Sequence, residues 1–325
     1  MSDDGSATPG EADRTAGVAL SDVTERELRT VFDEMSYVAN DDLLTTVLLG
    51  LRLGKPLLIE GEPGAGKTEL AKVLAHGFDT ELIRLQCYEG LAAENALYEW
   101  NYTKQLLAVQ SGDRGVDGDG SVFSEDYLLE RPLLRALRSD DETPQVLLID
   151  EVDRADEEFE ALLLEMLSDF QLSIPELGTV TASVPPVVVI TSNRTRGLSD
   201  ALKRRCLYVH VQPPSFDKER VILRRKVPEL DEATASAVCA VTQELREHPL
   251  LKQPGVAETL DWARALVDLE VDADDEITAD RIRSTAGFLL KEIEDVERID
   301  ELADDLTAAA RDARNSAETD TDQKR

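Results

Sequence analysis

The sequence has few cysteines, few aromatic residues and no long apolar run, and each shortage excludes a class of protein. Cys87, Cys206 and Cys239 lie far apart and lack metal-site spacing, so we expect reduced thiols rather than disulfides or a zinc site. A membrane helix needs roughly 18 consecutive apolar residues, and no segment approaches that length. The first residues, Met1 to Leu20, lack the basic start and apolar stretch of a secretory signal. These absences predict a cytoplasmic protein with no membrane partner.

Positive charge is also scarce, with 35 Lys and Arg against 67 Asp and Glu and a net charge of -32. Such a balance suits either a protein with a cationic partner or a proteome adapted to molar salt, in which ions screen self-repulsion. The acidic residues are spread along the chain, and only ten of the basic residues are lysine. Both features favour a halophilic source. No basic stripe is present, so nucleic acid is not expected as a partner.

The chain divides into segments of different composition. Residues 1–24 are small, polar and acidic, which predicts a disordered tail. Residues 111–126 alternate glycine with aspartate, which predicts a flexible insertion. Residues 314–325 are again polar and predict a second disordered tail. The folded part is therefore expected between these tails.

Short apolar runs alternate with helical patterns in the first half of that folded part, the signature of a parallel sheet covered by helices. The runs are Pro56–Glu60, Glu81–Gln86, Gln145–Ile149, Val187–Thr191 and Leu207–Val211. Five runs predict an α/β domain with a five-stranded parallel sheet over residues 25–213. After Pro213 and Pro214 only helical patterns remain, so residues 214–313 are expected to form a small all-helical domain.

One phosphate-binding pattern, GxxxxGK[ST], follows the first of these strands and opens a helix, as the motif requires. Its residues are Gly61, Glu62, Pro63, Gly64, Ala65, Gly66, Lys67 and Thr68. The glycines let backbone N–H groups turn toward phosphates, Lys67 would reach the β- and γ-phosphates, and the Thr68 hydroxyl would ligate Mg²⁺. The alternative is a glycine-rich turn that binds nothing. The pattern predicts binding of ATP with Mg²⁺.

A second motif is the apolar strand 146–149 that ends in Asp150 and Glu151. Asp150 would hold Mg²⁺, directly or through water, and Glu151 would act as general base toward the attacking water. Strands often end in solvated acids, so the pattern alone carries little information. Downstream of a phosphate-binding loop it predicts ATP hydrolysis.

Two further polar positions fit this chemistry. Asn193 ends another apolar strand, where it would orient the attacking water near the γ-phosphate, although an ordinary turn asparagine explains it as well. The cluster Lys203, Arg204 and Arg205 ends a helix just before the fifth strand. The helix dipole alone explains such a cluster. The functional interpretation is an arginine that stabilises the transition state at a neighbouring subunit's nucleotide.

These four elements, in this order, resemble the AAA+ superfamily over about residues 30 to 290. The resemblance implies a five-stranded αβα core, a helical lid and a ring oligomer, most often a hexamer, with active sites between subunits. Asn193 matches the family's sensor 1 residue, and Arg205 matches its trans-acting arginine finger better than Arg204 does. Gln86 matches the residue that gates the catalytic glutamate.

Two insertions narrow the resemblance to the MoxR group, namely the segment Ala93–Leu107 after the second strand and a predicted hairpin over Phe170–Val180. Four shorter stretches are similar to the MoxR subgroup that includes the carbon monoxide dehydrogenase maturation ATPase. They are Cys87–Gly90, Ala96–Trp100, Thr191–Arg196 and Ala201–Cys206. The resemblance implies a chaperone that inserts a metal cofactor or activates a protein complex, with a von Willebrand factor A-domain partner. Plain packing is the alternative explanation for Trp100 and Tyr102.

One departure stands out, because MoxR lids usually carry a sensor 2 arginine. The matching stretch here, Gly255–Thr259, contains none, and Arg264 is the nearest candidate substitute. Two other functions remain as alternatives to a remodelling chaperone. The Arg204–Cys206 stretch also resembles the clamp-loader arginine motif, which leaves open a nucleic-acid motor or clamp-loader-like switch. A non-hydrolysing scaffold is the other, and the presence of Glu151 and Arg205 argues against it.

Overall fold

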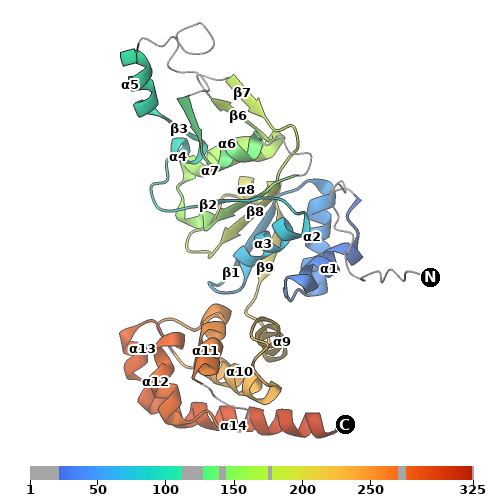
Figure 1. Ribbon diagram of the computed structural model, residues 1–325, viewed down its shortest axis with the longest axis vertical. Helices are drawn as coiled ribbons and strands as arrows, with labels where there is room; N and C mark the ends of the chain where they lie inside the picture. Colours follow the sequence, from blue (N-terminus) through green and yellow to red (C-terminus); the bar gives the residue numbers. More distant parts are fainter. Residues whose placement is uncertain (1–21, 112–126, 139–143, 175–177, 270–275, 324–325) are drawn as a thin grey trace, which may run out of the picture.

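A computed structural model describes residues 22–111, 127–138, 144–174, 178–269 and 276–323 of the chain. Figure 1 shows two parts, a sheet with flanking helices and a separate group of helices joined to it through the segment after β9. This arrangement follows from the composition, because apolar strand patterns end before residue 213.

The central sheet has five parallel strands in the order β2-β5-β8-β1-β9. They span Leu57–Gly61 (β1), Leu82–Gln86 (β2), Val146–Asp150 (β5), Val187–Ser192 (β8) and Leu207–Val211 (β9). Each coincides with one of the five apolar runs, so the predicted five-stranded parallel sheet is confirmed. Parallel strands buried on both faces read as continuous apolar runs, as β5 and β8 do.

Helices cover both faces of this sheet. Successive side chains of a strand point to opposite sides, so an apolar strand presents apolar side chains on both faces, and both must be buried. Leu147 and Ile149 face a core shared with α6, α7 and α8, whereas Val146 and Leu148 face a core shared with α1, α2 and α3. The first group spans Pro132–Leu137 (α6), Glu157–Asp169 (α7) and Asp200–Arg205 (α8). The second spans Glu25–Glu34 (α1), Asp41–Leu53 (α2) and Lys67–Gly77 (α3). The part is therefore an αβα sandwich.

Two insertions extend this sandwich at the end of Figure 1 opposite the helical part. The first comprises Ala93–Leu97 (α4), Tyr98–Trp100 (β3), Tyr102–Ser111 (α5) and Leu128–Glu130 (β4), with β3 and β4 antiparallel. The second is the antiparallel hairpin Gln171–Ile174 (β6) and Gly178–Thr181 (β7), which confirms the predicted strands. Its turn at 175–177 lies outside the described residues. Trp100 is buried edge-to-face against Tyr98, so packing explains it, whereas Tyr102 is exposed.

In the second part, the described residues form helices and their connections, with a core of their own around the fully buried Trp262. Its helices are Phe216–Lys226 (α9), Glu232–Glu247 (α10), Val256–Asp268 (α11), Ala279–Leu289 (α12), Ile293–Glu297 (α13) and Ile299–Gln323 (α14). Side chains of Ser215, Asp231 and Thr278 cap α9, α10 and α12, satisfying backbone N–H groups that have no partner inside the helix. We call residues 215–323 the lid.

The tail boundaries differ from those predicted. Helix α14 continues to Gln323, so the predicted disorder is wrong for residues 314–323. Arg314 and Ala317 are buried and continue the buried face of the helix that includes Ala310. Val23 is buried in the sheet core and Thr24 caps α1, so the N-terminal boundary lies before Val23. Residues 1–21, 112–126 and 324–325, on which the remaining disorder predictions fall, lie outside the described residues. Within the described part, no helix combines the length and apolar character of a membrane span.

Candidate active site

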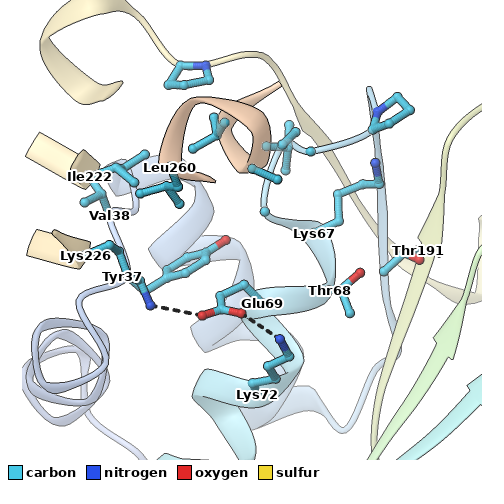
Figure 2. A pocket seen from close by; sticks show the side chains of 18 of the residues that line it. Tyr37, Val38, Lys67, Thr68, Glu69, Lys72, Thr191, Ile222, Lys226 and Leu260 are labelled. Atoms are coloured by element: carbon cyan, nitrogen blue, oxygen red, sulfur yellow. Dashed lines mark hydrogen bonds and ion pairs between the residues drawn. The ribbon is translucent and has the colours of Figure 1, made fainter. Parts of the chain in front are cut away.

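The phosphate-binding loop joins β1 to α3 and lines a cavity of about 560 Å³ between the sandwich and the lid (Figure 2). Gly64 and Gly66 adopt positive φ angles of 79° and 84°, which L side chains rarely allow. Gly66 directly precedes α3, so the N-terminal amides of that helix open onto the cavity, an arrangement suited to anions. The predicted residues from Pro63 to Thr68 all line this cavity.

The two remaining residues of the motif act from outside the cavity. Gly61 ends β1, and a Cβ there would lie 2.3 Å from the Val211 oxygen, so glycine permits close approach of β1 and β9. The carbonyl oxygens of Gly61 and Glu62 accept hydrogen bonds from Lys67 Nζ at 2.8 and 2.7 Å. Burial lowers the pKa of Lys67, although nearby carboxylates, led by that of Asp153, oppose the shift. The ammonium group is therefore held at the base of the loop.

Asp150 connects three elements at the carboxyl end of β5. Its Oδ1 accepts hydrogen bonds from the hydroxyls of Thr191 at 2.6 Å and Thr68 at 3.0 Å. Its Oδ2 accepts two from the Arg84 guanidinium, at 2.6 and 3.1 Å. The Thr68 hydroxyl and the Asp150 carboxylate are the hard oxygen donors that Mg²⁺ prefers, and they lie together beside the loop. The donor set therefore fits the predicted metal.

Glu151 lines the same cavity and is held by its backbone. Its φ of 56° is unusual for a residue with a side chain, and its N–H donates to Thr191 Oγ1 at 2.9 Å. Its carboxylate pairs with Arg154 at 3.2 Å and is about one-third exposed. Strained backbone of this kind is often found where a fold fixes a functional side chain. Thr191 thus connects Glu151 with Asp150.

Asn193 also lines the cavity, on the loop after β8. Its N–H donates to Asp153 Oδ1 at 3.1 Å, and both the N–H and the hydroxyl of Thr195 donate to Asp153 Oδ2, at 2.8 and 2.6 Å. Burial raises the pKa of Asp153, but these hydrogen bonds outweigh it and bring the pKa below its ordinary value. Asp153 therefore fixes the loop that presents Asn193.

Arg205 lies apart from these residues. It is exposed at the end of α8, where its guanidinium donates to Ser168 Oγ at 3.0 Å and to the Ala201 oxygen at 3.4 Å. It is not among the described residues that line the cavity. Gln86, predicted to gate Glu151, accepts a hydrogen bond from Arg84 at 2.7 Å. The fold therefore gathers the loop, Asp150, Glu151 and Asn193, and leaves Arg205 on another surface.

The lid closes the far side of the cavity. Ile222, Leu260 and Val38 form an apolar wall there, which suits the flat ring of a nucleotide base (Figure 2). Lys226 of the lid donates to Glu69 of α3 at 3.0 Å, and Glu69 also pairs with Lys72. Arg264, the candidate sensor 2 substitute, lines the cavity and pairs with Asp261 at 3.2 Å. Lid and sandwich thus share one pocket.

Sequence reasoning did not identify Arg84, Asp153 or Lys226 as part of this region. Arg84 had a detectable signal, because it lies two residues before Gln86 on an edge strand and so shares its face. Asp153 and Lys226 act through partners far away in sequence, at Thr195 and Glu69, and no local pattern marks such pairs.

Comparison with known proteins agrees with these motifs. Residues 56–206 match the model of the AAA domain (dynein-related subfamily). An uncharacterized protein of Staphylococcus epidermidis is 25% identical over 225 residues, covering 67% of this chain and 78% of its own. An uncharacterized protein of Staphylococcus haemolyticus is 26% identical over 241 residues, covering 72% and 84%.

Among solved structures, the Thermotoga maritima RuvB Holliday junction branch migration motor is similar, with 19% identity and a TM-score of 0.40. The match covers 79% of this chain and 67% of that one. A mutant of the same protein matches with 18% identity and a TM-score of 0.44, covering 82% and 71%. The family match and the sheet order together show that this chain has the AAA+ fold, carries an AAA domain over residues 56–206 and is an ATPase.

Proposed function

We propose that the protein is a MoxR-type AAA+ chaperone that uses ATP hydrolysis to remodel or activate a protein complex. The observation that carries the chemistry is one cavity lined by Lys67, Thr68, Asp150, Glu151 and Asn193. The two insertions, with β3, α5 and β4 in the first and β6 and β7 in the second, support the MoxR assignment.

In the proposed reaction, Lys67 moves its hydrogen bonds from the loop carbonyls to the β- and γ-phosphates of ATP. Glu151 accepts a proton from the attacking water while Asn193 orients that water toward the γ-phosphorus. The bond between the γ-phosphorus and its bridging oxygen breaks, which gives ADP and phosphate. Thr68 and Asp150 would hold Mg²⁺, which when bound neutralises charge on the phosphate oxygens.

The proposed assembly is a ring, most often a hexamer in the family that the sequence resembles. Arg205 is exposed and lies outside the nucleotide cavity of its own subunit. Its position therefore leaves it available to contact the nucleotide of a second subunit. In this assembly, Arg205 of one subunit stabilises the transition state at its neighbour's nucleotide. The proposed partners are a von Willebrand factor A-domain protein and a client complex, and metal-cofactor insertion is the form of activation that the resemblance suggests.

Hydrolysis is tested with Glu151→Gln and Lys67→Ala in the full chain. The Gln variant should bind ATP and lose turnover, because it removes the base and keeps the residues that contact phosphate and metal. The Ala variant should lose nucleotide binding. Turnover by the Gln variant at the wild-type rate would refute the role of Glu151.

The same Gln variant tests the partners, because it should remain ATP-bound on its client. Pull-down from the native cell is expected to recover a von Willebrand factor A-domain protein and the client, while Lys67→Ala recovers neither. Absence of any such partner from the eluate under both ATP and ADP would contradict the assignment.

A further inference from the structure

Backbone of the lid lies against backbone of the phosphate-binding loop at Gly255 and Gly64, with the carboxylate of Glu258 beside them. A Cβ placed at Gly255 would lie 3.0 Å from the Pro63 oxygen and 3.2 Å from Gly64 Cα. Gly255 directly precedes α11, and the first residues of that helix, Val256 and Ala257, line the nucleotide cavity. The positive end of the α11 dipole therefore lies beside the loop, in the stretch where a sensor 2 arginine was expected.

A buried ion pair lies beneath this contact. Glu219 of α9 is fully buried and accepts two hydrogen bonds from Arg246 of α10, at 2.7 and 2.8 Å. The buried hydroxyl of Thr259 in α11 donates to the same carboxylate at 2.9 Å. Burying a carboxylate is costly unless its oxygens are paired in this way, and the bidentate geometry restricts the orientation of both partners. The pair thus joins three lid helices at one point.

The same side chains hold backbone where the lid meets the sandwich. Arg246 Nε donates to the Pro254 oxygen at 2.7 Å, and Thr259 Oγ1 lies 3.0 Å from the Gly255 oxygen. Gln243 bridges Glu219, at 3.0 Å, to the oxygen of Pro214 in the segment that connects β9 to α9. In the described part of the chain, the outward hydrogen bonds of the Arg246, Thr259 and Gln243 side chains therefore end at the linker or at the stretch against the phosphate-binding loop.

We propose that Glu219 and Arg246 are positioning residues that press Gly255 against the phosphate-binding loop, so that the lid controls nucleotide affinity through this backbone contact. The proposal rests on the ATPase pocket and is independent of the client and partners. Arg246 acts through Pro254 and Gly255 and contacts no reacting group. Disturbing the network should therefore weaken nucleotide binding more than it slows the chemical step.

The test compares Arg246→Lys with Arg283→Lys in the full chain, measuring MgADP affinity by calorimetry together with kcat and KM for ATP. Lysine keeps the charge of Arg246 and loses the bidentate fork and the bond to Pro254. We expect about tenfold weaker MgADP binding and a matching rise in KM, with kcat changed less than about twofold. Arg283, which pairs with Asp280 and Asp300 on the lid surface, should tolerate the same change.

A second pair of variants tests the contact without altering the ion pair. Gly255→Ala places a methyl group 3.0 Å from the Pro63 oxygen, 3.1 Å from the Glu258 carboxylate and 3.2 Å from Gly64 Cα, whereas Gly287→Ala in α12 meets open space. We expect weaker MgADP binding for the first variant only. The double variant Gly255→Ala/Arg246→Lys should bind MgADP no more weakly than the single variant with the lower affinity, because both substitutions disturb one contact.

Three results would overturn the proposal. In the first, Arg246→Lys lowers the melting temperature and leaves MgADP affinity unchanged, which would show that Arg246 only stabilises the fold. In the second, the two losses multiply in the double variant. In the third, Gly255→Ala binds MgADP as wild type does, and this result decides alone if Arg246→Lys does not fold. Failure of the wild-type chain to bind MgADP would instead refute the proposed function.

Discussion

Arg84 donates two hydrogen bonds to one carboxylate oxygen of Asp150, at 2.6 and 3.1 Å. The guanidinium is half exposed, whereas the Asp150 side chain is almost completely buried. Asp150 is the carboxylate proposed to hold Mg²⁺, so a fixed cation lies directly beside the proposed metal position. Two cations at one carboxylate repel each other, and Arg84 should therefore moderate metal affinity.

The first prediction is that Arg84→Gln lowers the Mg²⁺ concentration needed for half-maximal ATP binding, by about threefold. The effect is modest because solvent screens a half-exposed guanidinium. Binding of a fluorescent ATP analogue during a Mg²⁺ titration measures it, in the Glu151→Gln background. Arg29→Gln, which removes a surface pair with Glu25 and Asp41, is the matched control. A Mg²⁺ requirement that is unchanged or higher in Arg84→Gln would show that Arg84 supports the metal site instead.

The second prediction concerns the loop that presents Asn193. Asp153→Ala removes the acceptor of three hydrogen bonds from Asn193 and Thr195 and should let that loop move. We expect kcat to fall on the order of ten- to a hundredfold, because small displacements near a reacting centre cost this much, with KM little changed. Asp217→Ala, the control at a mostly exposed carboxylate, should leave both kcat and KM unchanged. A rise in KM at constant kcat would place Asp153 in nucleotide binding rather than in loop positioning.

The third prediction follows from the net charge of -32. Surface carboxylates such as those of Asp41, Asp217 and Asp280 are 85%, 84% and 95% exposed, and physiological salt already screens repulsion between exposed charges that lie more than about 8 Å apart. A protein adapted to molar salt should gain melting temperature well beyond that point. We expect a continued rise between about 0.5 and 3 M KCl, followed by circular dichroism, while sucrose of equal osmolality serves as control. A plateau above about 0.5 M would mean ordinary screening and would refute a halophilic origin.

Much of the fold could be predicted because it depends on local patterns. Strands β5 and β8 are buried on both faces and are apolar up to the polar residues at their carboxyl ends, and the phosphate-binding loop is a pattern of eight consecutive residues. The order of the strands also brought Asp150, Glu151 and Asn193 to one edge, as expected for neighbouring parallel strands. Local sequence was enough wherever neighbours in the chain are neighbours in the structure.

The rest depends on pairs that are distant in sequence. Arg84 and Asp150 are 66 residues apart, and Glu219 and Arg246 are 27 apart, so neither partner carries a mark of the other. The end of α14 was predicted as disordered because the helices it packs against are also distant in sequence. Its composition is polar, yet Arg314 and Ala317 are buried, and α14 packs along α10 and α12. Burial on one face stabilises a helix whose sequence alone reads as a tail.

The position of Arg205 leads to the last prediction. Its guanidinium bonds Ser168 and Ala201 on the surface of α7 and α8, and Lys67 lies in the cavity, so one chain does not bring the two together. In the proposed ring, each active site combines Lys67 of one subunit with Arg205 of the next. Specific activity should then rise with protein concentration, and Arg205→Ala should bind ATP yet hydrolyse it poorly.

Mixing two inactive variants tests this arrangement directly. Lys67→Ala has no working nucleotide site but offers an intact Arg205, and Arg205→Ala has the reverse. An arginine supplied from a neighbour can contribute roughly 10³-fold in rate, so each variant alone should be nearly inactive. In mixed rings, an Arg205→Ala subunit that receives Arg205 from a Lys67→Ala neighbour regains a complete site, and we expect partial recovery of phosphate release. The double variant Lys67→Ala/Arg205→Ala, mixed with either single variant, is the control and should restore nothing, because no pairing then combines both residues. If mixed rings form and activity does not return, Arg205 does not act across the interface, and the proposed assembly loses its main chemical support.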